Sequence, residues 1–292
     1  MSNVTLGVDV SDLIARLAIV RGSEVVASGI VAANRPAAIK DAAKKALASA
    51  GGTVSGIAIA QASATEEAAD DLRAALAAVA PKCPQHLIAA GLAAAIAEQR
   101  RGAAVGASQL IAFSIAEHVT AGVLINGAPW LGAHGLASSI GWLALNPVER
   151  EDYRRYGSLE AEVAAAGIVR RFVWRIKSGD RSRVADQVSG DFSKITAADI
   201  LQGARAGDGV AISVVRDTAK YIGMAVANLA TLFDPESIVL GGIIASSGDI
   251  MFDAIKTEAH RRLLPQQAEQ VGIVLSTLGD DAVAIGAALA HS

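Results

Sequence analysis

The sequence predicts an α/β protein in which one structural unit occurs twice. Residues 1–105 read in the order strand, strand, strand, helix, strand, helix, strand, helix. The same order returns after residue 106 once a largely helical insertion is set aside. Short apolar or alternating segments indicate the strands, and longer segments between helix start and stop signals indicate the helices. We therefore expect two lobes of similar construction.

The first unit opens with three mainly apolar segments separated by short turns, which predict antiparallel strands. These segments are residues 4–10, 13–20 and 24–31. Pro36 then begins a helix that stops at Gly51, since proline is favoured at the first helical position and glycine after the last one. The remaining elements are a strand at 55–60, a helix from Thr65 to near Pro81, a strand at 86–89 and a helix at 92–101.

The second unit repeats this plan. Strands are expected at 109–114 and 119–125, the hairpin signal Asn126-Gly127 follows, and 140–145 serves as the third strand. The insertion runs from about 158 to 207. A long helix at 210–233 ends before Pro235, because the residue before a proline disfavours helical backbone. The last elements are a strand at 237–240, a helix at 249–263, a strand at 271–275 and a helix at 281–290.

Two copies of such a unit describe the actin-like ATPase, ribonuclease H-like duplicated fold, with two lobes and a central cleft. Three antiparallel strands continue into a parallel sheet, and helices cover both faces. The expected domains are residues 1–105, with the last helix at about 280–292 as a candidate to complete them, and residues 106–279. In kinases of this shape, nucleotide and phosphoryl acceptor meet in the cleft, so the loops joining strands one and two of each unit matter most.

The bulk composition excludes several classes of protein. The chain has 292 residues, a formal net charge of −3 and one cysteine, Cys83, so a disulfide framework or a thiolate zinc site within one chain is not expected. The longest apolar run, 87–97, is too short to span a bilayer. The N-terminus shows no signal peptide, so we expect a cytoplasmic protein with no membrane partner.

Seven stretches of the chain resemble the ROK family, which groups sugar kinases and sugar-responsive transcriptional regulators of the NagC type. They are LGVDV at 6–10, AGVLING at 121–127, GAHG at 132–135, SIGW at 139–142, GSLE at 157–160, VLGG at 239–242 and LGDDAVAIGA at 278–287. Their order and spacing are similar to the family's over nearly the whole chain. The resemblance implies the two-lobed fold, a homodimer, and a nucleotide site between the lobes.

Both phosphate loops depart from the family pattern. The family's Asp-x-Gly-Gly-Thr-Lys is represented by Asp9, Val10, Ser11, Asp12, Leu13 and Ile14, and its Gly-Thr-Gly-Ile-Gly by residues 116–120, which include Glu117. Glycines let backbone N–H groups approach phosphate oxygens, and here side chains replace them. Asp12 could repel a polyphosphate or simply serve as a hairpin-turn residue, and we favour the turn. Gly241 and Gly242 remain from the family's adenosine side, although any tight strand–helix turn uses such a pair.

By the resemblance, the family's catalytic base is absent here, and several of its sugar-binding residues are replaced. The family's catalytic aspartate corresponds to Ala90, which cannot accept a proton. Asp70 and Asp71 are read instead as solvated helix acids. Candidate sugar contacts are Glu160, Ser139 and His134, with Glu160 equally readable as an early-helix acid. No zinc is expected, because the family's His and three Cys positions hold Trp142, Glu151, Tyr153 and Ser158; Trp142 and Tyr153 are expected to fill that space by aromatic packing.

A basic, partly apolar helix inside the insertion is the last feature. Arg170, Arg171, Arg175, Lys177, Arg181 and Arg183 cluster there with Asp180 among them. An anionic ligand or nucleic acid could bind this face, but a solvated face beside a dimer contact is the preferred interpretation. The family's repressors carry a winged helix before the first strand, and this chain begins that strand at Val4. We therefore expect no direct contact with nucleic acid.

Three functions stay open at this stage. The first, which we prefer, is a catalytically impaired sugar-kinase homologue without an expected cofactor, which senses a sugar or other small ligand or regulates a partner. The second is an active ATP- and Mg-dependent kinase of a hexose or N-acetylhexosamine with displaced site residues. The third is a NagC-like regulator without its own DNA-binding domain.

Overall fold

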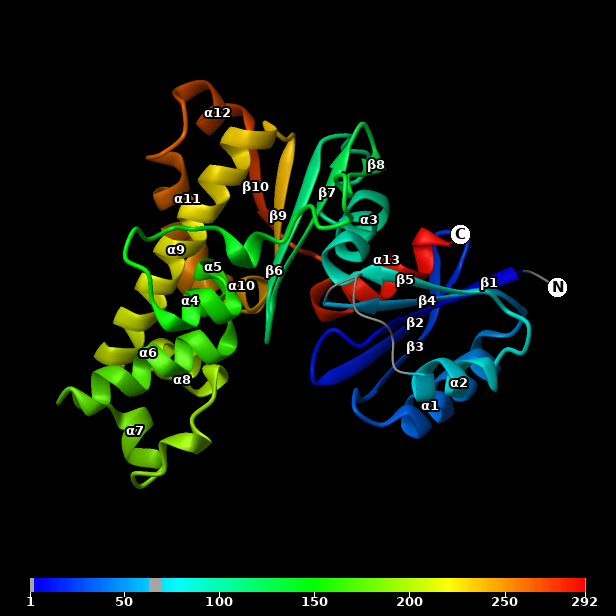
Figure 1. Cartoon of the computed structure of the whole chain (residues 1–292), viewed down its shortest axis with the longest axis horizontal. Coiled ribbons are helices and arrows are strands. Elements are labelled where there is room, and N and C mark those ends of the chain that lie inside the picture. The colour runs from blue at the N-terminus through cyan, green and yellow to red at the C-terminus, as the bar shows by residue number, and fades with distance from the viewer. Residues whose placement is uncertain (1–2, 63–69, 292) are drawn as a thin grey trace.

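The computed structural model of the protein describes residues 3–62 and 70–291. The chain forms two lobes, each built on a five-stranded mixed sheet (Figure 1). This arrangement contains the two similar α/β units that the repeated order of elements predicts. No helix among the described residues is long and apolar enough to cross a membrane.

The first lobe has strands in the order β3-β2-β1-β4-β5. β1 pairs antiparallel with β2 and parallel with β4, so the sheet changes from antiparallel to parallel at its centre. Its elements are β1 (Asn3–Asp9), β2 (Ile14–Arg21), β3 (Glu24–Ala32), α1 (Pro36–Ala50), β4 (Thr53–Gln61), α2 (Asp70–Ala77), β5 (Gln85–Ala89) and α3 (Ala90–Arg101). The predicted start of a helix at Thr65 lies outside the described residues.

The second lobe repeats this order as β10-β9-β6-β7-β8. Its strands are β6 (Leu110–Ile115), β7 (Val119–Ile125), β8 (Ala128–Pro129), β9 (Ser237–Gly242) and β10 (Gly272–Leu275). The predicted insertion consists of α5 (Ser158–Val163), α6 (Ala165–Lys177), α7 (Arg183–Gln187), η2 (Phe192–Lys194) and α8 (Ala197–Arg205). The other helices are η1 (Ile140–Trp142), α4 (Glu151–Tyr156), α9 (Gly209–Phe233), α10 (Ile243–Ser246), α11 (Gly248–His260), α12 (Pro265–Gln270), η3 (Gly279–Asp281) and α13 (Ala282–Ala290).

The prediction of a third strand at 140–145 is wrong. That strand is β8, which directly follows the turn at Asn126 and Gly127, where both φ angles are positive, at 53° and 74°. Such a two-residue turn returns the chain at once to an antiparallel partner. Residues 140–142 instead form the short 3₁₀ helix η1. The six-residue helix α12, begun by Pro265, was not predicted.

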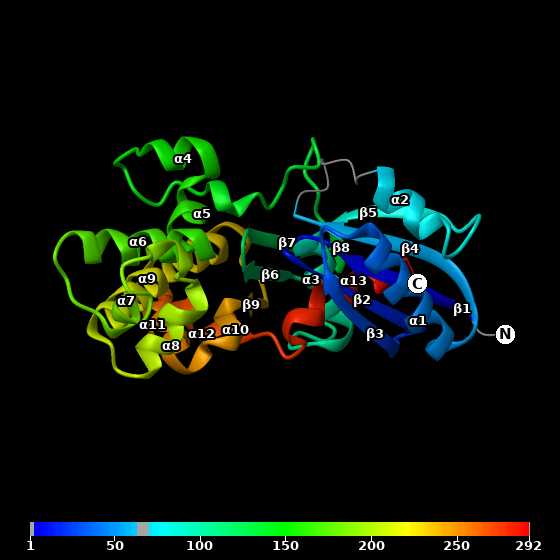
Figure 2. The same ribbon diagram turned by 90° about the horizontal axis from the view of Figure 1, so that it is seen from below.

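The alanine-rich helices α3 and α13 lie between the two sheets (Figure 2). They share a core with residues of both lobes, including Val20 of β2 and Leu110 of β6. A Cβ on Gly286 of α13 would lie 1.7 Å from the carbonyl oxygen of Ala93 in α3. Such close approach requires small residues, which explains why these two helices are rich in alanine and glycine.

Candidate functional site

A cavity of about 430 Å³ opens between the lobes, where β1, β6 and β9 end. Both hairpin turns that join the first two strands of each lobe reach it. All six residues predicted for the degenerate nucleotide site line this cavity: Asp9, Ser11, Asp12, Glu117, Gly241 and Gly242. The structure therefore brings together residues that are more than 200 positions apart in the sequence.

The first-lobe turn uses its own carboxylates to satisfy its backbone. Oδ1 of Asp9 accepts hydrogen bonds from the Ser11 N–H at 2.9 Å and the Ser11 hydroxyl at 2.6 Å. Oδ1 of Asp12 accepts from the Leu13 N–H at 2.6 Å. Two N–H groups of the turn thus point at acids of the protein. A phosphate oxygen would have to displace a carboxylate to reach either donor.

Asp9 is 5% exposed at the end of β1. Burial disfavours the charged form and raises the pKa of this carboxyl to about 6, although the two hydrogen bonds from Ser11 act in the opposite direction. Asp9 is therefore mostly ionised at pH 7 and about half ionised at pH 6, and it is a titratable group inside the cavity.

The second-lobe turn, residues 116–118, is held in a similar way. Oε2 of Glu160, at the start of α5, accepts the Val119 N–H at 3.1 Å, and Oε1 lies 3.2 Å from Nδ1 of His118. The hydrogen bond with Glu160 raises the pKa of His118, and the charges of Asp12 and Glu117 act in the same direction. The turn that should receive phosphate is again tied to a carboxylate.

Gly241 and Gly242 end β9 beside this turn. Gly242 has a φ of +62°, and a Cβ there would lie 2.1 Å from the carbonyl oxygen of Ile115. The position therefore requires glycine because β9 runs against β6 and the chain turns sharply into α10. This geometry accounts for the pair without a nucleotide, as the tight-turn interpretation expected.

Three charged residues that line the cavity, Arg16, Glu98 and Asp280, were not predicted as site residues. Arg16 of β2 donates to Asp280 at 2.7 Å and forms an ion pair with Asp281 at 3.4 Å. Glu98 of α3 is buried, accepts the Ala103 N–H at 2.7 Å and accepts the hydroxyl of Ser276. The sequence of β2, IARLAIVR, does not alternate and gives no signal that places Arg16 on the cavity side. Arg16 and Asp280 are 264 residues apart in the sequence, and no local pattern predicts that they are in contact.

The profile of the ROK family matches residues 36–292. The chain belongs to the ROK family. A glucokinase from Halalkalibacterium halodurans is 33% identical over 198 residues, which are 66% of this chain and 59% of the glucokinase. The DNA-binding transcriptional dual regulator NagC from Escherichia coli is 29% identical over 194 residues, which are 66% of this chain and 46% of NagC. The chain thus spans about half the length of the curated relatives it matches.

Solved structures confirm the predicted two-lobed, actin-like fold of this ROK protein. A ROK family transcriptional regulator, a homologue of the E. coli MLC protein, superimposes with a TM-score of 0.81 at 22% identity and covers all of this chain and 78% of its own. A ROK glucokinase from Streptomyces griseus, in complex with glucose and AMPPNP, has a TM-score of 0.78 at 24% identity, with 98% of both chains covered.

The remaining family positions of this ROK chain lie as follows. Ala90 is fully buried at the first position of α3, directly after β5. Ser139 and His134 are exposed in the segment before η1 and are not among the residues that line the inter-lobe cavity. Glu160 contacts the cavity through His118, and a Cβ on Gly141 would lie 3.1 Å from its Oε2. Asp70 and Asp71 are exposed in the first turn of α2.

The expectation that Trp142 and Tyr153 together fill the space of the family's zinc site by aromatic packing is wrong for Trp142. Trp142 is 60% exposed, whereas Tyr153 is buried and donates its hydroxyl to Glu162. A polar contact therefore fixes Tyr153. Among the described residues, no group of three or more His, Cys, Asp or Glu side chains is arranged to hold a metal ion.

Proposed function

We propose that this ROK protein binds a small ligand of the sugar class between its lobes and acts as a sensor or regulatory partner without phosphorylating that ligand. The observation that carries the proposal is the charge of the cavity. Its described lining contains five carboxylates, Asp9, Asp12, Glu98, Glu117 and Asp280, against the single guanidinium of Arg16 and the imidazole of His118.

Electrostatics makes this cavity a poor site for a triphosphate. Arg16 is already paired with Asp280 and Asp281, so it offers little attraction to a further anion. At 4 Å, two like unit charges repel by about 4 kcal/mol at an effective dielectric constant near 20. The N–H donors of Ser11, Leu13 and Val119 are taken by carboxylates of the chain itself.

Chemistry at the acceptor side supports the same proposal. A kinase of this shape needs a base within hydrogen-bonding reach of the sugar hydroxyl. Alanine stands at position 90, at the junction of β5 and α3. A neutral sugar needs no such base for binding, because hydroxyl groups are recognised by hydrogen bonds alone.

One observation favours the alternative of an active kinase. Asp9 lies in the cavity with a pKa of about 6, which is a useful value for a general base near neutral pH. An active ROK kinase would need Mg²⁺ to shield its phosphates from Asp12 and Glu117. The similarity to glucokinases keeps this alternative in the test below.

The test compares ligands in calorimetric titrations of the full chain. Glucose and N-acetylglucosamine, without nucleotide, should give saturable heats, while Mg-ATP alone should give none. A coupled assay for ADP release should show no sugar-dependent turnover. Sugar-dependent ADP release that is lost in Asp9→Asn would replace this proposal with the kinase alternative. The predicted homodimer, cytoplasmic location and absence of direct DNA binding stay predictions.

A further inference from the structure

A second cavity, of about 770 Å³, lies in the helical part of the second lobe, away from the inter-lobe site. It is bordered by Arg150, directly before α4, and by residues of α5, α6 and α9. Its lining includes Arg150, Arg170, Arg171, Arg175, Trp174 and Tyr221. Four guanidinium groups and two aromatic rings at one cavity are more than a solvated helix face needs, so the cavity is a candidate binding site.

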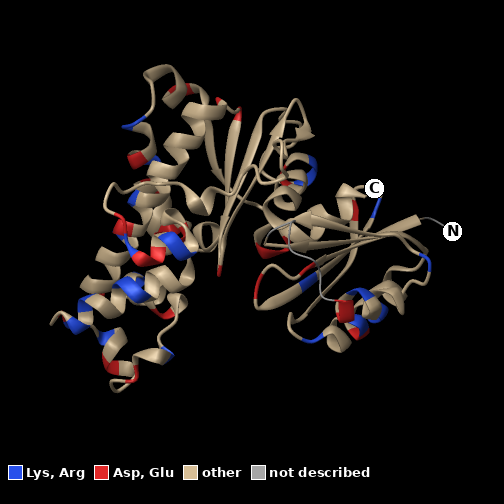
Figure 3. Cartoon of the chain, viewed as in Figure 1, with Lys and Arg blue, Asp and Glu red and all other residues tan. Residues whose placement is uncertain are grey.

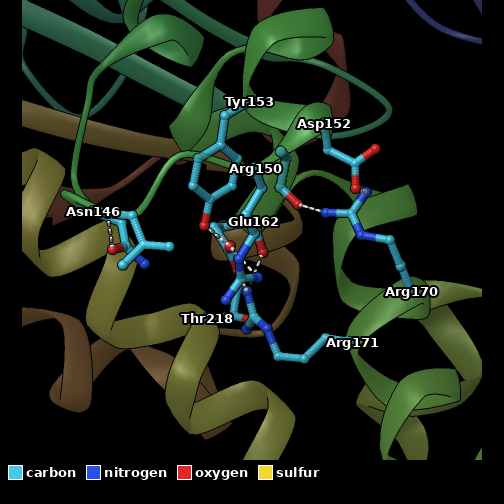
Figure 4. Close-up of polar contacts among 10 residues, drawn as sticks. Asn146, Arg150, Asp152, Tyr153, Glu162, Arg170, Arg171 and Thr218 are labelled. Carbon is cyan, nitrogen blue, oxygen red and sulfur yellow. Dashed lines mark hydrogen bonds and ion pairs between the residues drawn. The ribbon is translucent and has the colours of Figure 1, made fainter.

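The floor of this cavity is a buried carboxylate that two arginines share. Glu162 is 4% exposed, and it accepts hydrogen bonds from the hydroxyl of Tyr153 and from Arg171, with Arg150 at 3.3 Å (Figure 4). Arg171 also donates to Thr218 at 3.1 Å and lies 5.4 Å from the ring of Tyr221. One negative charge therefore compensates two positive ones at the floor.

The rim arginines pair with half-exposed acids. Arg170 forms an ion pair with Asp152 at 3.2 Å and also donates to the carbonyl oxygen of Ala161. Nε of Arg175 donates to Asp180 at 2.7 Å. Exposed ion pairs of this kind are weak, so an incoming oxyanion competes with them readily. Each guanidinium has five N–H donors, and in the described contacts Arg175 uses Nε alone and Arg150 uses one terminal nitrogen. The unused donors can receive phosphate oxygens.

Trp174 defines the other half of the site. Its side chain is 68% exposed at the cavity, next in sequence to Arg175. An exposed indole beside cationic donors offers an apolar face to a ring, while the guanidinium groups hold an anion.

The charge pattern disfavours a long polyanion at this place. Acidic and basic residues are interspersed over the helices of the second lobe (Figure 3), and Asp180 and Asp217 line the cavity itself. A nucleic acid backbone laid across the face would pass these acids, whereas a small anion can enter between them.

We propose that this cavity binds a phosphomonoester that also carries a ring, either a phosphorylated sugar or a nucleoside monophosphate. The phosphate is held by Arg150, Arg171 and Arg175, and the ring lies on Trp174. This proposal is independent of the ligand between the lobes, because the two cavities share no lining residue.

Calorimetric titration of the full chain with glucose 6-phosphate, AMP, inorganic phosphate and glucose tests the proposal. One of the two ring-bearing phosphates should bind about tenfold more tightly than inorganic phosphate, which identifies the source of the ring. Arg150→Gln and Arg175→Gln should each weaken that binding by about tenfold, since each removes a charge-assisted hydrogen bond. Trp174→Ala should weaken the binding of the ring-bearing ligand and leave the affinity for inorganic phosphate unchanged.

Arg154→Gln is the matched control. It removes the same charge from α4, but Arg154 pairs with Glu149 outside the cavity. It should change the affinity by less than about twofold, as should Arg16→Gln in the inter-lobe cavity. Absence of saturable binding up to about 10 mM would overturn the proposal. Equal losses of affinity in Arg154→Gln and Arg175→Gln would also overturn it. A third contrary result would be that the chain binds duplex DNA and not the monoesters, and that Arg175→Gln abolishes the DNA binding.

Discussion

Nδ1 of His118 lies 3.2 Å from Oε1 of Glu160, and this contact ties the second-lobe hairpin turn to the first turn of α5. The second oxygen of Glu160 accepts the Val119 N–H, so one carboxylate holds the end of the turn where β7 begins. Glu160, which the family resemblance offered as a sugar contact, thus makes both of its carboxylate contacts with this turn.

Glu160→Gln should lower the pKa of His118, since the hydrogen bond with Glu160 is the largest cause of its elevation. A raised folded-state pKa stabilises the fold fully below the unfolded value near 6.5 and loses that effect as the pH rises through the folded value. Glu160→Gln should lower the free energy of unfolding by less than about 1 kcal/mol, because the pair is half-exposed. NMR titration of His118 in both proteins measures this, and an unchanged pKa in Glu160→Gln would contradict the contact.

Asp9→Asn should stabilise the protein at pH 8 and not at pH 4. Burial raises the pKa of Asp9 from 3.8 to about 6, so its contribution is present below 3.8 and is lost as the pH rises through 6. Above that pH the parent chain must hold a buried charge, and removing it should add about 2 kcal/mol to the free energy of unfolding. Urea unfolding at both pH values measures the difference. Asp41→Asn, on the exposed face of α1, should show no such contrast.

The sequence predicted the order of strands and helices along the chain, apart from the third strand of the second lobe, and the family resemblance supplied the six residues of the degenerate nucleotide site. Alternation, turn residues and two short motifs place Asp9, Asp12 and Glu117 at strand ends, and strand ends of the two lobes meet in this fold. The repeated order of elements predicted two lobes with a cleft between them.

What the sequence could not provide depends on contacts between distant segments. Glu98 lies near the end of an alanine-rich helix, where the sequence alone suggests an exposed side chain. However, α3 lies between two sheets, and the carboxylate is buried. Tyr153 looked like a core aromatic, but its hydroxyl meets Glu162 because α4 folds back onto α5. The false strand at 140–145 arose because β8 has only two residues, too few to produce alternation.

Neutralising both acids at the hairpin tips should let ATP bind. The double variant Asp12→Asn, Glu117→Gln removes two negative charges from the cavity, and we expect it to bind ATP at low salt at least about tenfold more tightly than the detection limit at which the parent shows no binding. The gain should shrink in about 0.5 M salt because screening weakens charge repulsion. Calorimetry at both salt concentrations measures this, with Asp41→Asn as control. A double variant that binds ATP no better than the parent would show that charge is not what excludes nucleotide.

Glu162→Ala should destabilise the protein strongly. Arg171 is only 15% exposed, and the variant would leave its guanidinium without its carboxylate partner, at a cost of about 3 kcal/mol. Tyr153→Phe removes a single hydrogen bond and should cost about 1 kcal/mol. Urea unfolding ranks the two variants. Glu149→Gln, in the exposed pair with Arg154, should be indistinguishable from the parent, and a similar loss in all three would contradict a special role for Glu162.

Gly91→Ala tests the contact that joins the lobes. A Cβ at this position of α3 would lie 2.2 Å from the carbonyl group of Ala121 in β7, and both atoms belong to elements that cannot shift without moving a sheet. Overpacking of this kind costs about 1–3 kcal/mol. Gly209→Ala at the start of α9 is the matched control, because a Cβ there meets nothing within 4 Å. Urea unfolding should therefore separate the two variants. Equal stabilities would mean that α3 does not approach β7 this closely, and that the inter-lobe cavity is wider than described.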